Sequence, residues 1–190
     1  MVKKKLIPTG TKREDCVQTP IELANAIVNH FKPTGNILEP CKGDGNFLKA
    51  LPKDTEWCEI LENKDFFNFE KKVNWIITNP PYSIFRKFTN HSMEIADEIV
   101  FLITINHIWL KARLRDIDEK GFGIKEILLI DTPKTFPQSG FQFGIIHLSK
   151  NYIGDIKFSK LNSEEEVKTC STKHDIPPNP KDSGILSNFT

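Results

Sequence analysis

The sequence has 190 residues, of which 38% are hydrophobic and 27% are charged, and its formal net charge is +1. This length allows one domain with a proper core and excludes two domains of ordinary size. The near-zero charge excludes a strong overall attraction to nucleic acid or acidic membranes, and it does not favour tight DNA binding by the chain alone.

Neither a membrane segment nor a cysteine-based site is indicated. No apolar run approaches the roughly 18–20 residues of a membrane span, and the N-terminus lacks the long apolar core of a signal peptide. The cysteines at positions 16, 41, 58 and 170 form no CxxC pair, so neither a zinc site nor a disulfide framework is expected. We therefore expect a cytoplasmic protein with reduced thiols, no metal and no membrane partner.

The charge is unevenly distributed at the N-terminus. Residues 1–13 contain no acid and five bases, namely Lys3, Lys4, Lys5, Lys12 and Arg13. Residues 1–15 are therefore interpreted as a basic arm. This arm either lies on phosphates or is a solvated, frayed terminus, and the pattern is consistent with both.

The first clear element is a helix over residues 20–31. Pro20 suits the first helical position, Thr19 can cap the helix, and Glu22 completes a capping box with Thr19. Apolar residues recur along one face of this segment, and residues 32–35 end it.

Short apolar runs then alternate with helical patterns. We predict strands over residues 36–39, 56–60, 75–78, 99–104 and 125–131, helices over 47–51, 83–96 and 109–120, and a terminal antiparallel strand pair over 142–149 and 155–161. This alternation predicts one α/β domain over residues 16–162, with a mostly parallel sheet and helices on both faces. Polar residues and proline dominate residues 163–190, which predicts an irregular tail.

A glycine-containing loop connects the first predicted strand to the next helix. It reads Glu39-Pro40-Cys41-Lys42-Gly43-Asp44-Gly45-Asn46-Phe47. Glycine lets the backbone approach a ligand closely, and open α/β sheets bind ligands at the carboxyl ends of their strands. On its own, the loop is equally consistent with a structural turn.

The tetrapeptide Asn79-Pro80-Pro81-Tyr82 follows another predicted strand. Two prolines constrain the backbone and remove two donors, which leaves carbonyl acceptors beside an amide and an aromatic ring. The Asn79 side-chain oxygen and the Pro80 carbonyl can receive the two protons of a planar amine, while Tyr82 stacks on its ring. The alternative is a tight turn without function.

Together, Glu-Pro-x-x-Gly-x-Gly-x-Phe and Asn-Pro-Pro-Tyr resemble the class I S-adenosylmethionine-dependent methyltransferases, and among them the site-specific adenine-N6 DNA methyltransferases, over residues 16–161. The resemblance implies a Rossmann-like methyltransferase fold, S-adenosyl-L-methionine as cofactor, and direct in-line methylation of an exocyclic amine, with adenine N6 in DNA favoured. Asn-Pro-Pro-Tyr also occurs in RNA amino-methyltransferases and glutamine-N5 protein methyltransferases. A cofactor-binding but inactive subunit of a methyltransferase complex is a further alternative.

The resemblance also implies roles for individual residues. Thr19-Pro20 resembles the motif that closes over the methionine part of the cofactor, Glu59 matches the acid that binds the ribose hydroxyls, and Asp65-Phe66 resembles the pair that contacts the adenine. The implied cofactor set is Thr19, Pro20, Glu39, Pro40, Gly43, Gly45, Phe47, Glu59, Asp65 and Phe66. An exposed acid after a strand and a turn with two core aromatics are the non-functional alternatives for Glu59 and Asp65-Phe66.

On the target side, the implied catalytic set is Asn79, Pro80, Pro81 and Tyr82. Phe136, Phe141 and Phe143 lie where the family has an aromatic residue that packs on the extruded base, and Phe141 and Phe143 are our candidates. Lys111, Arg113 and Arg115 alternate along the chain and are candidates for phosphate contacts, with a solvated surface as the alternative.

Two features depart from the family. Glu59 and Asp65 are too close to accommodate the helix and full strand that usually separate these motifs, so the sheet is expected to lack one element. Only residues 163–190 follow the domain, whereas family members with this motif order usually carry a sizeable target-recognition domain there. We therefore expect weak DNA binding of low specificity, or specificity supplied by a partner subunit.

Overall fold

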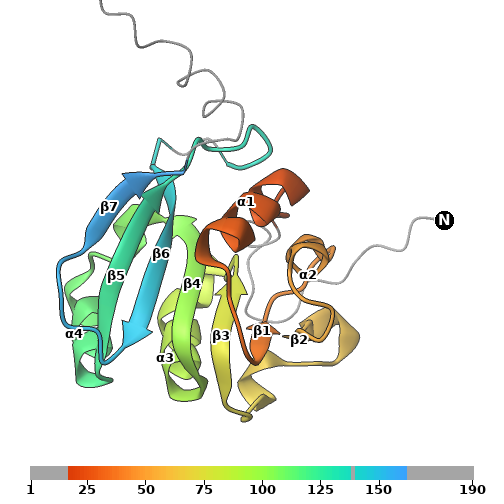
Figure 1. Ribbon diagram of the computed structural model, residues 1–190, viewed down its shortest axis with the longest axis horizontal. Coiled ribbons are helices and arrows are strands. Elements are labelled where there is room, and N and C mark those ends of the chain that lie inside the picture. Colours follow the sequence, from red (N-terminus) through yellow and green to blue (C-terminus); the bar gives the residue numbers. More distant parts are fainter. Residues whose placement is uncertain (1–16, 138–139, 162–190) are drawn as a thin grey trace, which may run out of the picture.

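The computed structural model describes residues 17–137 and 140–161 (Figure 1). The strands are β1 (Ile37–Glu39), β2 (Glu56–Trp57), β3 (Val73–Thr78), β4 (Ala96–Thr104), β5 (Phe122–Leu129), β6 (Phe143–Lys150) and β7 (Lys157–Lys160). The helices are α1 (Ile21–Phe31), α2 (Asn46–Ala50), α3 (Phe85–Ile95) and α4 (Lys111–Glu119). The predicted basic arm and C-terminal tail lie outside the described residues.

The seven strands form one sheet in the order β2-β1-β3-β4-β6-β5-β7. Neighbouring strands from β2 to β4 are parallel, β6 is antiparallel to both β4 and β5, and β7 is parallel to β5. The predicted mostly parallel sheet is therefore confirmed. The prediction that the last two strands pair with each other is wrong, because β6 inserts between β4 and β5 and β7 joins the far side of β5.

Helices cover both faces of the sheet, with α1 and α2 on one face and α3 and α4 on the other (Figure 1). Successive residues of β4 face the two helix layers alternately. Ile99 packs with α3 and α4, whereas Val100 packs with α1 and α2. Both residues are at most 1% exposed, as expected for a central strand buried on both faces. The predicted three-layer arrangement is confirmed.

The start of α1 differs from the prediction. The helix begins at Ile21 with Pro20 as its N-cap, and no side chain caps it, so the predicted capping box of Thr19 and Glu22 is wrong. Thr19 is only 5% exposed, and its carbonyl accepts a hydrogen bond from the Asn46 side chain at 2.8 Å. Thr19 is thus held by the first residue of α2 and does not cap α1.

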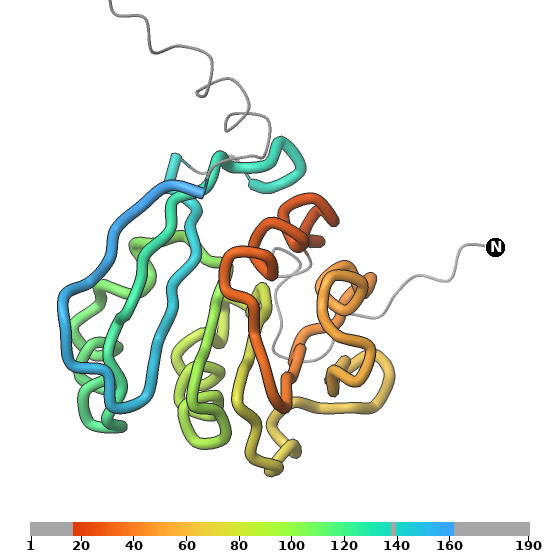
Figure 2. The backbone as a smooth tube through the Cα atoms, viewed as in Figure 1, coloured from red at the N-terminus to blue at the C-terminus, as the bar shows by residue number. Residues whose placement is uncertain are grey.

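The chain between β2 and β3 forms a compact loop at the edge of the sheet (Figure 2). It contains two short 3-10 turns, η2 (Ile60–Glu62) and η3 (Phe66–Asn68), and no strand. The sequence-based expectation that one sheet element is missing here is confirmed. As a consequence, Glu59 and Asp65 are brought to the carboxyl ends of β1 and β2 by turns.

Candidate functional site

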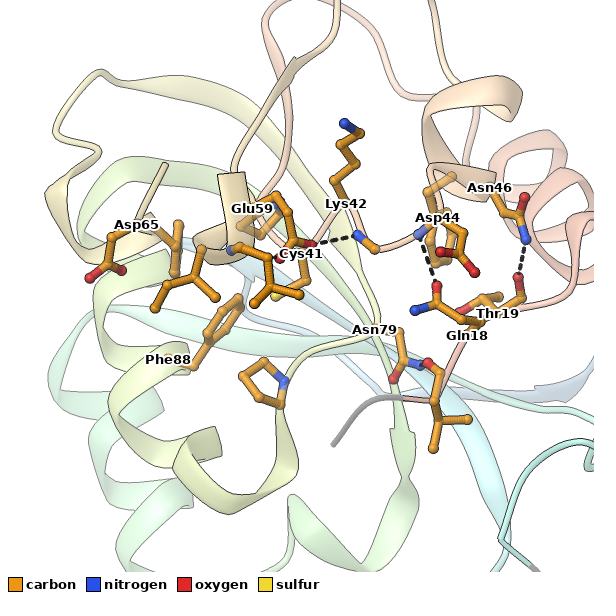
Figure 3. A pocket seen from close by; sticks show the side chains of 18 of the residues that line it. Gln18, Thr19, Cys41, Lys42, Asp44, Asn46, Glu59, Asp65, Asn79 and Phe88 are labelled. Carbon is orange, nitrogen blue, oxygen red and sulfur yellow. Dashed lines mark hydrogen bonds between the residues drawn. The ribbon is translucent and has the colours of Figure 1, made fainter. Parts of the chain in front are cut away.

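A cavity of about 340 Å³ lies at the carboxyl ends of β1, β2 and β3 (Figure 3). Cavities of this size accommodate small-molecule ligands and cofactors. Its wall comes from four parts of the chain: residues 17–19; residues 40–44 with 46–47; residues 59–61 with 65–67; and a group of Asn79, Pro81, Ile84 and Phe88. The glycine loop and the Asn-Pro-Pro-Tyr segment therefore meet at one site.

The glycine loop forms one side of the cavity with its backbone. Gly43 has φ +52, and its N–H donates to the Glu59 carboxylate at 2.9 Å. A Cβ at Gly43 would lie 2.5 Å from Oε1 of Gln18, so a larger residue would collide there. The positive φ and the close approach of Gln18 both require glycine at this position.

Glu39 stabilises the glycine loop through hydrogen bonds. It is 0% exposed, accepts hydrogen bonds from the Thr78 hydroxyl at 2.6 Å and the Cys41 N–H at 2.9 Å, and is not part of the cavity wall. Burial raises the pKa of the Glu39 carboxyl to about 8, although the bonds from Thr78 and Cys41 act in the opposite direction. The structure thus makes Glu39 a support for β1 and β3 and does not place it as a direct contact of the cofactor.

The other predicted cofactor residues also divide into those that line the cavity and those that do not. The cavity is lined by Thr19, Pro40, Gly43, Phe47, Glu59, Asp65 and Phe66. Pro20 and Gly45 are not part of its wall: Pro20 caps α1, and Gly45, with φ +78, is the N-cap of α2.

Glu59 and Asp65 precede the two turns and are among the residues that line the cavity. Glu59 accepts from the Leu61 N–H at 3.1 Å as well as from Gly43, and Asp65 accepts from the Phe67 N–H at 3.0 Å. A carboxylate has about four acceptor positions, so both groups retain the capacity to bind hydroxyl or amino protons of a ligand.

Aromatic side chains form the adjoining wall. Phe66 is 4% exposed and packs on Phe88 with ring centroids 4.4 Å apart, while Phe67 is half-buried, and all three contribute to the lining. This end of the cavity offers flat apolar surface beside the Asp65 carboxylate, as a planar heterocycle with an amino group requires.

The Asn79 side chain occupies the opposite end. Its Nδ2 atom donates to the Val17 carbonyl at 3.1 Å, and its Oδ1 atom accepts from the Tyr82 hydroxyl at 3.2 Å. The Tyr82 hydroxyl also lies 3.3 Å from the Leu102 carbonyl oxygen. Pro80 is buried behind this group, and Pro81 lines the cavity.

The three phenylalanines proposed for the target side have different environments. Phe136 and Phe143 are each 2% exposed and pack edge to face at 5.1 Å, whereas Phe141 is 58% exposed. Phe143 is therefore a core residue and is not available to stack on a base. Of the two candidates, only Phe141 has the required exposure.

The basic candidates also differ from each other. Lys111 is exposed at the start of α4, but Arg113 lies over the Phe85 ring at 5.0 Å and donates to the His107 carbonyl. Burial and the neighbouring Arg86 lower the pKa of Arg113. Arg113 therefore stabilises the turn before α4, and the structure does not support its predicted phosphate contact.

The sequence matches no protein-family model and no curated protein sequence. The structure is similar to a candidate class I S-adenosylmethionine-dependent methyltransferase from Listeria monocytogenes, with a TM-score of 0.58 and 14% identity over 86% of this chain and 71% of that chain. A candidate RNA methyltransferase from Pyrococcus horikoshii gives a TM-score of 0.52 and 16% identity. That match covers 72% of this chain and 87% of the other chain. The M protein of the type I restriction enzyme EcoKI gives a TM-score of 0.54 and 15% identity. That match covers 72% of this chain and 44% of the M protein.

These similarities identify the fold. The chain has the class I methyltransferase fold. The Rossmann-like fold predicted from the sequence is thereby confirmed, and the cavity lies at the strand ends where open α/β sheets bind ligands. This chain spans less than half of the EcoKI M protein.

Sequence reasoning missed several residues at this site of the methyltransferase fold. Val17 contributes a backbone carbonyl, which no side-chain pattern reveals. Gln18 and Asn46 form side-chain hydrogen bonds to residues that are distant in sequence. The position of Gln18 next to the matched Thr19-Pro20 pair was the only available signal. Within residues 17–137 and 140–161, no cluster of His, Cys, Asp and Glu suits a metal, and no helix is long and apolar enough to span a bilayer.

Proposed function

We propose that this chain transfers a methyl group from S-adenosyl-L-methionine to the N6 atom of adenine in DNA. The observation that carries the proposal is the shared cavity, whose lining includes Gly43, Glu59 and Asp65 together with Asn79. A site for a nucleoside cofactor is thus continuous with a site for an amine.

The chemistry of the lining fits the cofactor. Glu59 would accept protons from the ribose hydroxyls, and Asp65 would accept from the adenine amino group while Phe66 or Phe67 packs against the ring. The side of the cavity formed by residues 17–19 and the glycine loop would hold the methionine part. When bound, S-adenosyl-L-methionine supplies an electrophilic methyl group on a positively charged sulfur.

Asn79 would act on the target amine. An aromatic amine is a poor nucleophile because its lone pair is conjugated with the ring. Asn79 Oδ1 and the Pro80 carbonyl would each accept one amine proton, which favours a tetrahedral nitrogen and directs the lone pair toward the methyl group. Oδ1 has two lone pairs, so it can receive an amine proton and the Tyr82 hydroxyl together.

Adenine in DNA is favoured over other amines by the Glu-Pro start of the glycine loop and the phenylalanine after its second glycine, as in the adenine-N6 DNA group. The similarity to a type I restriction M protein supports the same choice. With a net charge of +1, the chain would bind DNA weakly and with low specificity when alone, or would rely on a partner subunit. We place this activity in the cytoplasm.

The test is nucleoside analysis after incubation with isotopically labelled cofactor. Duplex DNA, single-stranded DNA, RNA and a glutamine-containing protein extract are each treated with the full chain or with Asn79→Ala, digested, and examined by mass spectrometry. We expect labelled N6-methyldeoxyadenosine from DNA with the wild type and a strongly reduced amount with the variant. Label only in ribonucleosides or in glutamine would assign a different substrate, and no label in any sample would reject the activity.

A further inference from the structure

We infer that residues 17–19 couple the glycine loop to the amide of Asn79, and that Gln18 is a positioning residue for methyl transfer. This inference rests on the proposed function, because it assigns a task to the same cavity. The segment precedes α1 and is far in sequence from both of the motifs that it joins.

Three consecutive residues of the cavity wall each make one hydrogen bond to another part of that wall. The Val17 carbonyl accepts from Asn79 Nδ2 at 3.1 Å, Gln18 Oε1 accepts from the Asp44 N–H at 3.0 Å, and the Thr19 carbonyl accepts from Asn46 Nδ2 at 2.8 Å. Figure 3 shows Gln18 and Thr19 facing the glycine loop, with Asn79 nearby. One short segment therefore contacts both the cofactor side and the target side.

The bond to Val17 determines which way the Asn79 amide faces. An asparagine side chain has an acceptor oxygen and a donor nitrogen at nearly equivalent positions, and a 180° turn about its last bond exchanges them. With Nδ2 held by the Val17 carbonyl, Oδ1 is directed away from it, toward Tyr82. In the opposite orientation, two N–H groups would face the N–H groups of an amine, and binding would be repulsive.

The position of Val17 depends in turn on the glycine loop. Gln18 Oε1 fits against Gly43 so closely that a Cβ there would lie 2.5 Å away, and it bonds to the next residue, Asp44. Gly43 is itself held by Glu59. A ligand that contacts Glu59 and the loop is therefore connected through Gln18 and Val17 to the orientation of Asn79.

Gln18→Met tests the kinetic effect, because methionine keeps the length of the side chain and lacks the amide acceptor. We expect kcat to fall about 3- to 10-fold, the typical effect of one lost hydrogen bond. Gln18→Glu retains an acceptor oxygen and should keep more of the wild-type kcat. In the Asn79→Ala background, Gln18→Met should cause no further loss of kcat, because the residue acts through Asn79. Effects on kcat that multiply in the double variant would overturn the inference.

Amide exchange measured by NMR tests the coupling without any activity. Exchange of the Asp44 N–H should accelerate about 3- to 10-fold in Gln18→Met and also in Asn79→Ala, whereas the Phe67 N–H, bonded to Asp65 in a separate turn, serves as the control. An Asp44 exchange rate unchanged by Asn79→Ala would reject the coupling. If the wild type methylates nothing while Asp44 responds as expected, the proposed function fails and the coupling stands.

Discussion

The Thr78 hydroxyl donates to the Glu39 carboxyl at 2.6 Å, and neither residue has any exposed surface. This bond joins the carboxyl ends of β1 and β3, which carry the two halves of the site. The second oxygen of Glu39, Oε2, is buried and has no hydrogen-bond partner among the described residues. An ionised carboxylate is costly in such a place, which is why the group favours its proton.

The first prediction concerns Glu39→Gln and pH. Burial raises the pKa of Glu39 from 4.5 to about 8, so the folded chain keeps a proton that the unfolded chain releases. The contribution of this group to stability is therefore fully present below pH 4.5 and decreases as the pH rises toward 8. Glutamine does not titrate. The free energy of unfolding of the variant, relative to wild type, should rise by about 2–4 kcal/mol between pH 5 and pH 8.

Urea unfolding without cofactor at several pH values measures this difference. Glu22→Gln, on the exposed face of α1, is the control for loss of an ordinary carboxylate. Identical pH profiles for the wild type and Glu39→Gln would show that Glu39 is ionised in the folded chain.

The second prediction concerns Asn79→Ala. If Asn79 Oδ1 receives an amine proton, the variant loses an interaction that strengthens in the transition state, and kcat should fall about 10²- to 10³-fold. Cofactor affinity should change little, because Asn79 is assigned to the target. Tyr82→Phe removes only the hydroxyl that donates to Asn79 and should have a milder effect. Steady-state kinetics measures kcat, and calorimetry measures cofactor affinity. Near-normal turnover in Asn79→Ala would refute the assigned role.

The third prediction concerns Glu59→Ala. The variant loses the proposed ribose contact and also the bond that holds Gly43, so affinity for S-adenosyl-L-methionine should weaken by about 1–3 kcal/mol. Glu62→Ala is the matched control, since the Glu62 side chain is exposed in the same turn and bonds only to Lys42 among the side-chain contacts described. Calorimetric titration measures both variants, and equal losses of affinity would argue against a direct role for Glu59.

The fourth prediction separates Phe141 from Phe143. Phe143→Ala removes a side chain that is 2% exposed and should cost about 3–5 kcal/mol of stability. Phe141→Ala should leave stability within about 0.5 kcal/mol, because its ring is 58% exposed. Phe141→Ala should also weaken target binding by about 1–3 kcal/mol if the ring stacks on the base. Urea unfolding and KM for DNA measure the two effects, and an unchanged KM in Phe141→Ala would remove it from the target site.

Much of the fold was predictable because the sequence signals were local. The alternation of apolar runs and helical patterns located the strands and helices, and the continuous apolar run of β4 indicated its central place. Pairing of the last strands was not predictable in this way. Residues of β6 are buried on both faces, which fits a position between two strands, but the apolar pattern does not specify which strands those are.

The site was predictable to the extent that residue type determines chemistry. Gly43 and Asn79 were identified because few other residues can adopt the required backbone or supply an amide oxygen. The Glu39 carboxylate was misplaced because a sequence motif does not distinguish a residue that touches the ligand from one that supports the loop. The three bonds of residues 17–19 use two backbone carbonyls and therefore leave no pattern in the sequence.

The two ends of the sheet have a consequence for self-association. The edge strand β2 has two residues and β7 has four, with Lys157 and Lys160 at the ends of β7. Short edge strands expose few unpaired backbone groups, which leaves little backbone for another molecule to pair with. The loop that follows β2 in place of a longer strand thus shapes the cavity and also limits the backbone that is available for cross-molecular strand addition at this edge.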